Sequence, residues 1–197
     1  MLPEHRGILQ ELSADSWGQL YRCRWSAEQR CRILPLLQEL LESPDALTQQ
    51  AGLDFAGRIG VCNQLGALEP IVLPVIRLTF DSDPMTRSMA VAVLSIIGRD
   101  APEPACKALI VHLDDPELTA PALRGIMSIG QPADAAVPHV IPLCGATEAK
   151  LRILAIRTLA AIGAKSPEVD RILKAASNDR SKVVRAAAEK ARLLLGV

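Results

Sequence analysis

The chain has 197 residues, which suits one domain or one uninterrupted array of small units. Apolar residues make up 49% of it and charged residues 22%, with 22 basic and 22 acidic side chains, which excludes a disordered, highly charged protein. Aromatic residues make up only 3%, so Leu, Ile, Val and Ala must fill the core, and an all-α protein is favoured over aromatic-rich strands.

The N-terminal residues carry no signal for secretion or membrane insertion. No apolar stretch with a small-residue cleavage site begins the chain, and the most apolar run, residues 89–98, is too short to span a bilayer. The five cysteines are scattered without a CxxC pair, so we expect inert buried thiols rather than disulfides or a zinc site. These features predict a cytoplasmic protein with no membrane partner.

The first third of the chain predicts three helices. Residues 1–28 should form an amphipathic helix, and residues 29–42 and 46–60 a helix pair joined by the turn at 43–45. The first helix carries aromatic side chains at helical spacing: Trp17, Tyr21 and Trp25. In the helix pair, Ala51 is expected at a small core position, 39 residues before Ala90.

An internal repeat governs the rest of the sequence. Four apolar segments end in glycines separated by 32, 33 and 33 residues: Gly98, Gly130, Gly163 and Gly196. Eight residues before each glycine stands an alanine: Ala90, Ala122, Ala155 and Ala188. Eleven before stand Arg87, Thr119, Arg152 and Arg185. Each segment therefore predicts an amphipathic helix that ends at a C-cap glycine.

A second apolar stretch precedes each of these helices. The four stretches are 71–80, 105–113, 136–143 and 169–176. The polar turns that follow them are 81–84, 114–116, 145–148 and 177–180. Each unit is therefore a helical hairpin, and because neither helix can bury its apolar face alone, successive hairpins should stack into a solenoid.

At this point the residues resemble a known family. The pattern from Asp81 to Gly98, Asp-x-Asp-Pro-x-x-Arg-x-x-Ala followed by apolar residues and Ile-Gly, resembles the HEAT repeat, in particular the short units common in bacterial proteins. The pattern departs at Thr119 and at residues 147–148, where looser turns are expected. The resemblance implies that each Arg pairs with an Asp of the neighbouring turn, with these candidates: Asp83, Asp115 and Asp179. The alternative for the arginines is an anion-binding row.

The predicted fold is an α-solenoid of about five stacked antiparallel helical hairpins with an N-terminal capping helix. It forms a single array over residues 1–197, with a cap and five repeats: 1–28, 29–68, 69–100, 101–132, 133–165 and 166–197.

The second helices should line the concave side of such a solenoid. Six residues before each glycine stand Ala92, Arg124, Arg157 and Lys190, which predict a basic stripe there. The candidate partner-binding residues are Met85, Ser88, Met89, Arg124, Met127, Arg157 and Lys190. The alternative is that the cations are ordinary solvated charges.

Charge is unevenly divided along the chain. Residues 150–197 hold 11 Lys/Arg and 4 Asp/Glu, a net of +7, whereas the net is −4 over 101–149 and −3 over 1–100. A positive end can attract an acidic protein or a nucleic acid, or can be the polar face of a terminal repeat. The lack of aromatic residues among these cations argues against single-stranded nucleic acid.

Catalytic patterns are missing from the sequence. The three histidines, His5, His112 and His139, are isolated and lack metal-ligand spacing, and no cofactor is expected. The sequence therefore favours a noncatalytic scaffold or adaptor that holds another protein in its concave groove. Two alternatives remain open from the resemblance: a protein similar to the phycobilin lyases, which attach or remove a bilin, and a DNA-binding module similar to the alkylpurine DNA glycosylases. The oligomeric state is left open.

Overall fold

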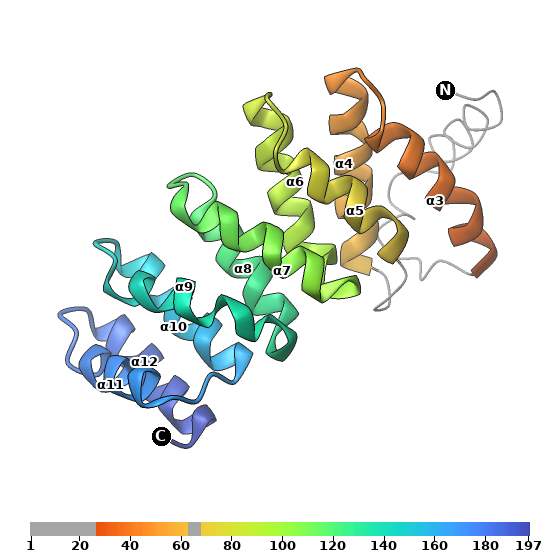
Figure 1. The fold of residues 1–197 in the computed structure, drawn as a ribbon. Helices are drawn as coiled ribbons and strands as arrows, with labels where there is room; N and C mark the ends of the chain where they lie inside the picture. The colour runs from red at the N-terminus through yellow and green to blue at the C-terminus, as the bar shows by residue number, and fades with distance from the viewer. Residues whose placement is uncertain (1–26, 63–67) are drawn as a thin grey trace. The chain divides into compact units, whose positions relative to one another are not determined.

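The computed structural model describes residues 27–62 and 68–197, and within them every regular element is helical (Figure 1). The chain forms two compact units, residues 1–101 and 102–197, which we describe one at a time. The predicted capping helix, with Trp17, Tyr21 and Trp25, lies outside the described residues.

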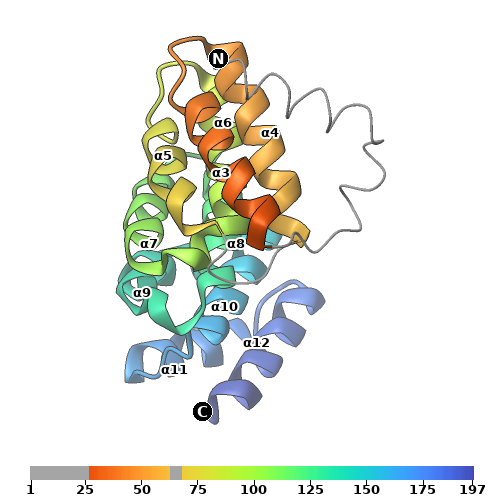
Figure 2. The same cartoon turned by 90° about the vertical axis from the view of Figure 1, so that its right-hand side faces the viewer.

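The first unit holds two stacked helical hairpins. Its helices are α3 (Ala27–Leu41), α4 (Ala46–Cys62), α5 (Glu69–Leu78) and α6 (Pro84–Ile97). The first helices, α3 and α5, pack against each other, and so do the second helices, α4 and α6 (Figures 1 and 2). This pairing within and between hairpins is what a repeat array requires, because each helix completes its core only with the next hairpin.

The two second helices of this unit begin with the same cap. Asp45 accepts hydrogen bonds from the backbone N–H of Thr48 at 2.8 Å and from its hydroxyl at 2.7 Å. Asp83 accepts the same two bonds from Thr86, both at 2.7 Å. The carboxylates thus satisfy N–H groups that have no partner within the helix. The equivalent residues are 38 positions apart.

This spacing corrects the predicted register of the first repeat. Gly52, rather than Ala51, lies 38 residues before Ala90; Gly52 is buried and Ala51 is exposed. A Cβ atom on Gly52 would lie 2.9 Å from the Cβ of Leu40. The alanine-to-alanine match was therefore wrong by one residue, because α3 approaches α4 so closely that only glycine fits.

The second unit holds the remaining three hairpins. Its helices are α7 (Pro102–Val111), α8 (Thr119–Ile129), α9 (Val137–Val140), α10 (Ala149–Ile162), α11 (Pro167–Ala176) and α12 (Lys182–Leu195). The second helices pack in sequence order, α8 on α10 and α10 on α12. The first helix of the middle hairpin is broken into α9 and flanking 3-10 segments, 131–136 and 141–145. Three prolines in this stretch remove backbone donors: Pro132, Pro138 and Pro142.

The helix ends match the predicted C-caps only in part. Gly163 and Gly196 are left-handed, with φ of 77° and 70°, and Gly130 also has a positive φ of 74°. Gly98 has φ −61°, so the prediction of a cap there was wrong. The chain continues through a 3-10 turn at residues 98–100, and the carboxylate of Asp100 accepts a hydrogen bond from the N–H of Leu68 at 2.8 Å.

The repeat alanines lie at the tightest helix contacts. All four are 0% exposed: Ala90, Ala122, Ala155 and Ala188. The next position holds a larger side chain, likewise 0% exposed, in three of the second helices: Val91, Leu123 and Ile156. Small and large core positions therefore alternate along each second helix, as the 3.6-residue spacing predicts.

Candidate functional site

The arginine column first serves the turns of the repeats. Each side chain at this position donates to the backbone carbonyl six residues earlier. The bonds are Gln49 to Ser43 at 2.8 Å, Arg87 to Asp81 at 2.8 Å, Thr119 to Leu113 at 3.0 Å, Arg152 to Ala146 at 2.9 Å and Arg185 to Asp179 at 2.7 Å. The column closes the turn of its own hairpin, and Thr119 does so without an arginine.

One arginine also reaches the next turn, as the HEAT resemblance implies. Arg152 is 6% exposed and binds Asp179 through two parallel bonds, Nε to Oδ2 and Nη2 to Oδ1, each of 2.8 Å. These bonds, with one from the Ser181 N–H, hold the pKa of Asp179 below its ordinary value. Asp83 is reached by Gln50 instead, at 3.0 Å. The described arginine contacts are thus internal, which supports a structural role over an anion-binding row.

The described cysteines have the environment of inert thiols. Cys106 and Cys144 are buried and free. Burial raises the pKa of Cys144 to about 12, and burial together with nearby Asp134 raises the pKa of Cys106. Neither thiol is therefore ionised at neutral pH, which a nucleophile or metal ligand requires. His112 is buried and His139 is exposed.

No group of three His, Cys, Asp or Glu side chains capable of holding a metal ion occurs in residues 27–62 and 68–197. In the same residues, none of the helices has the length and apolarity needed to cross a membrane.

Three of the candidate partner-binding residues lie on one face of α6 in the first unit. Met85 is 60% exposed, Ser88 is exposed and Met89 is half-buried. Their spacing of three and four residues puts them on the same side of the helix.

The second unit brings three of the remaining candidates together. Met127, Arg157 and Lys190 line a groove of about 450 Å³ formed by α8, α10 and α12. Arg157 and Lys190 are exposed, and Met127 is half-buried. Arg124 is exposed on α8 but does not line the groove.

The sequence analysis missed the apolar part of this groove. Its walls include aliphatic side chains on α10 and α12: Ile153, Val183 and Leu194. Its other lining residues are alanines: Ala160, Ala161, Ala186, Ala187 and Ala191. Several of these positions repeat at 33-residue spacing, such as Ala161 with Leu194, so the columns beside the cations carried the missing information.

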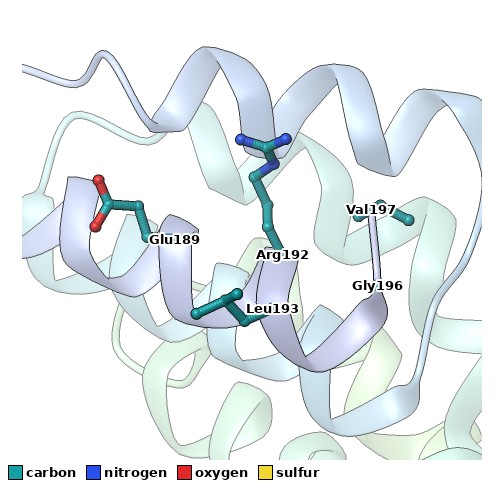
Figure 3. A pocket seen from close by; sticks show the side chains of 5 residues that line it. All are labelled: Glu189, Arg192, Leu193, Gly196 and Val197. Carbon is teal, nitrogen blue, oxygen red and sulfur yellow. The ribbon is translucent and has the colours of Figure 1, made fainter.

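A second hollow, of about 590 Å³, lies along α12, where Figure 3 shows Glu189, Arg192 and Leu193 on the helix and Val197 beyond its end. Glu189 and Arg192 occupy the repeat positions that Ile156 and Leu159 fill in α10, where both side chains are 0% exposed. Charged residues thus replace the apolar contact residues of the preceding repeat. This face is polar, as the terminal-repeat interpretation of the positive end predicts.

The comparisons with known proteins concern the fold. No family model and no curated protein matches the sequence. A designed armadillo repeat protein in complex with the peptide (KR)4 is similar with a TM-score of 0.74 and 18% identity, over 98% of this chain and 95% of that one. Computationally designed armadillo repeat proteins for modular peptide recognition give 0.69 and 16%, over 95% and 98%. An engineered protein gives 0.65 and 18%, over 87% and 85%. The chain therefore has an armadillo-like helical repeat fold.

Proposed function

We propose that this protein is a noncatalytic repeat scaffold of the HEAT type that binds another protein through the second helices of its repeats. The observation that carries the proposal is the groove between α8, α10 and α12, which three of the residues chosen from the sequence line. Exposed apolar surface rimmed by charge is typical of protein-binding sites. The face of α6 with Met85, Ser88 and Met89, together with Arg124, belongs to the proposed surface.

The proposed partner is acidic. Arg157 and Lys190 are the charged residues among those that line the groove, and no acidic residue lines it. The peptide in the designed armadillo complex is basic, so the partner of this protein carries the opposite charge. Opposite charges across an interface accelerate association and select the partner.

The proposal extends to the arrangement of the whole chain. A single array over residues 1–197, with a cap at 1–28, stays a prediction. The terminal position of the cap would leave the second-helix surface open to a partner.

Site-specific photocrosslinking tests the function. A benzoylphenylalanine placed at position 157 or 190 should crosslink a protein in living cells of the source organism. The same residue at position 171 or 174, on the exposed side of α11, serves as the matched control and should crosslink less. Equal crosslinking from both helices, or crosslinking to nucleic acid from the groove positions, would contradict the proposal.

A further inference from the structure

The groove in the second unit runs along its two main helices. Its lining residues on α10, from Ile153 to Ala161, and on α12, from Val183 to Leu194, recur at spacings of three and four residues. Each set therefore forms one face of its helix. On α12 this face spans about 16 Å, or about three helical turns. The groove is a furrow between neighbouring helices rather than a round pocket.

Small side chains give this furrow its depth. Ala161 and Ala186 are exposed, whereas Ala160 and Ala187 are half-buried. Alanine side chains end at Cβ, so another backbone can approach to roughly the 8–10 Å at which helix axes pack. Larger apolar side chains stand beside them, with Val183 63% exposed and Leu194 67% exposed. An occupant that covered both would remove apolar surface from water.

The chemistry of the lining distinguishes between possible backbones for the occupant. The lining side chains are alanine, aliphatic residues and methionine, apart from Arg157 and Lys190. They include no Ser, Thr, Asn or Gln that could pair with the backbone of an extended peptide. An extended strand would therefore lose hydrogen bonds to water without replacement, whereas an α-helix satisfies its own backbone.

The charges restrict the occupant further. Arg157 lies between Ile153 and Ala161 on α10, and Lys190 lies between Val183 and Leu194 on α12, so both cations stand midway along the furrow. Carboxylates near the middle of an occupant would meet both of them.

We propose that this furrow binds an amphipathic α-helix of a partner protein, about three turns long, that lies along α10 and α12. The helix presents small and apolar side chains to the alanines and an Asp or Glu near its middle to Arg157 and Lys190. The inference rests on the proposed function and specifies the partner's binding segment.

Selection from a peptide library tests the inference. The library is a phage-displayed set of 14-residue peptides with a helix-favouring frame and randomised positions, selected on the full chain. Selected peptides should have apolar or alanine residues at helical spacing and an acidic residue near the middle. Synthetic copies should gain helical circular dichroism on binding, with affinity measured by fluorescence anisotropy.

Two pairs of variants localise the binding. Ala161→Gln with Ala186→Gln fills the furrow with polar side chains and should weaken binding at least tenfold, whereas Ala175→Gln on exposed α11 should leave it unchanged. Arg157→Glu with Lys190→Glu should also weaken binding at least tenfold. The control, Lys165→Glu with Arg171→Glu, makes the same change in net charge at exposed positions outside the furrow and should have less than a twofold effect.

The outcomes separate this inference from the proposed function. Basic or proline-interrupted binders, binders without helix gain, insensitivity to the furrow variants, or a selection with no binder would overturn the helix inference. Self-association that Ala161→Gln with Ala186→Gln abolishes, measured by light scattering, would make a second copy the occupant and also overturn it. A protein crosslinked from position 157 or 190 through a nonhelical segment would overturn the helix and leave the scaffold function standing.

Discussion

At the residue scale, one repeat position performs two separable tasks. The side chains of Gln49 and Thr119 close their own turn by donating to the carbonyl six residues back, as Arg152 also does. Arg152 alone among these three has a second edge on its guanidinium, which binds Asp179 in parallel. The first task needs only one donor of suitable length, so the departure from arginine at Thr119 does not open the turn.

The Arg152–Asp179 pair predicts how stability depends on pH. Because the pKa of Asp179 is lower in the folded protein than its ordinary value near 3.9, its stabilising contribution is complete above that value. It is lost as pH falls through the lower folded pKa. Urea unfolding of the wild type and of Asp179→Asn should therefore differ clearly at pH 7 and converge below about pH 4. A gap that stays constant down to pH 2.5 would contradict this linkage.

At the element scale, close helix packing decides whether a glycine can be replaced. A Cβ on Gly52 in α4 would lie 2.9 Å from the Cβ of Leu40 and 3.3 Å from its backbone carbon, neither of which can swing aside. Gly52→Ala should therefore cost about 1–3 kcal/mol by overpacking, although alanine favours helices. Gly57 in the same helix has only Val93 Cγ2 at 3.4 Å, so Gly57→Ala should stabilise by up to about 1 kcal/mol. Chemical denaturation of both variants tests the pair, and equal effects would refute the register.

The central alanine of α8 gives a second test of packing. Ala122 is 0% exposed, and the larger Leu123 and Ile126 around it are also 0% exposed. Ala122→Leu should overpack this contact and lower the free energy of unfolding by about 1–3 kcal/mol. Ala161→Leu, at an exposed position on α10, is the control and should change stability by less than about 0.5 kcal/mol. Similar urea midpoints for the two variants would show that Ala122 is not tightly packed.

The elements themselves were largely predictable, because glycine spacing and apolar periodicity both report local backbone geometry. The helices ending at Gly130, Gly163 and Gly196 follow directly from that pattern. The details that failed depend on tertiary contacts. Gly98 continues into a turn whose Asp100 reaches Leu68, and Gly52 replaces the expected Ala51 because α3 approaches α4 closely. Neither contact leaves a periodic trace in the sequence.

At the scale of the whole molecule, the cations of the candidate site were predictable and its shape was not. Arg157 and Lys190 recur at one repeat position, and a charged column is visible in the sequence. The exposed alanines beside them, such as Ala161 and Ala186, look like ordinary helix-forming residues. They become the lining of a furrow only when α10 and α12 pack together. A site built from small side chains therefore requires the structure.

Reversing the whole basic column tests its contribution to partner capture. The variant Arg124→Glu, Arg157→Glu, Lys190→Glu changes three exposed side chains, so circular dichroism and urea midpoints should stay close to those of the wild type. Association with the protein crosslinked from position 157 should slow by about tenfold or more at low salt, because attraction that steers the encounter becomes repulsion. The slowing should diminish as salt is raised, since the Debye length shrinks to about 3 Å at 1 M. Stopped-flow measurements over a salt series give both quantities, and unchanged association at low salt would mean that the column is only a solvated surface.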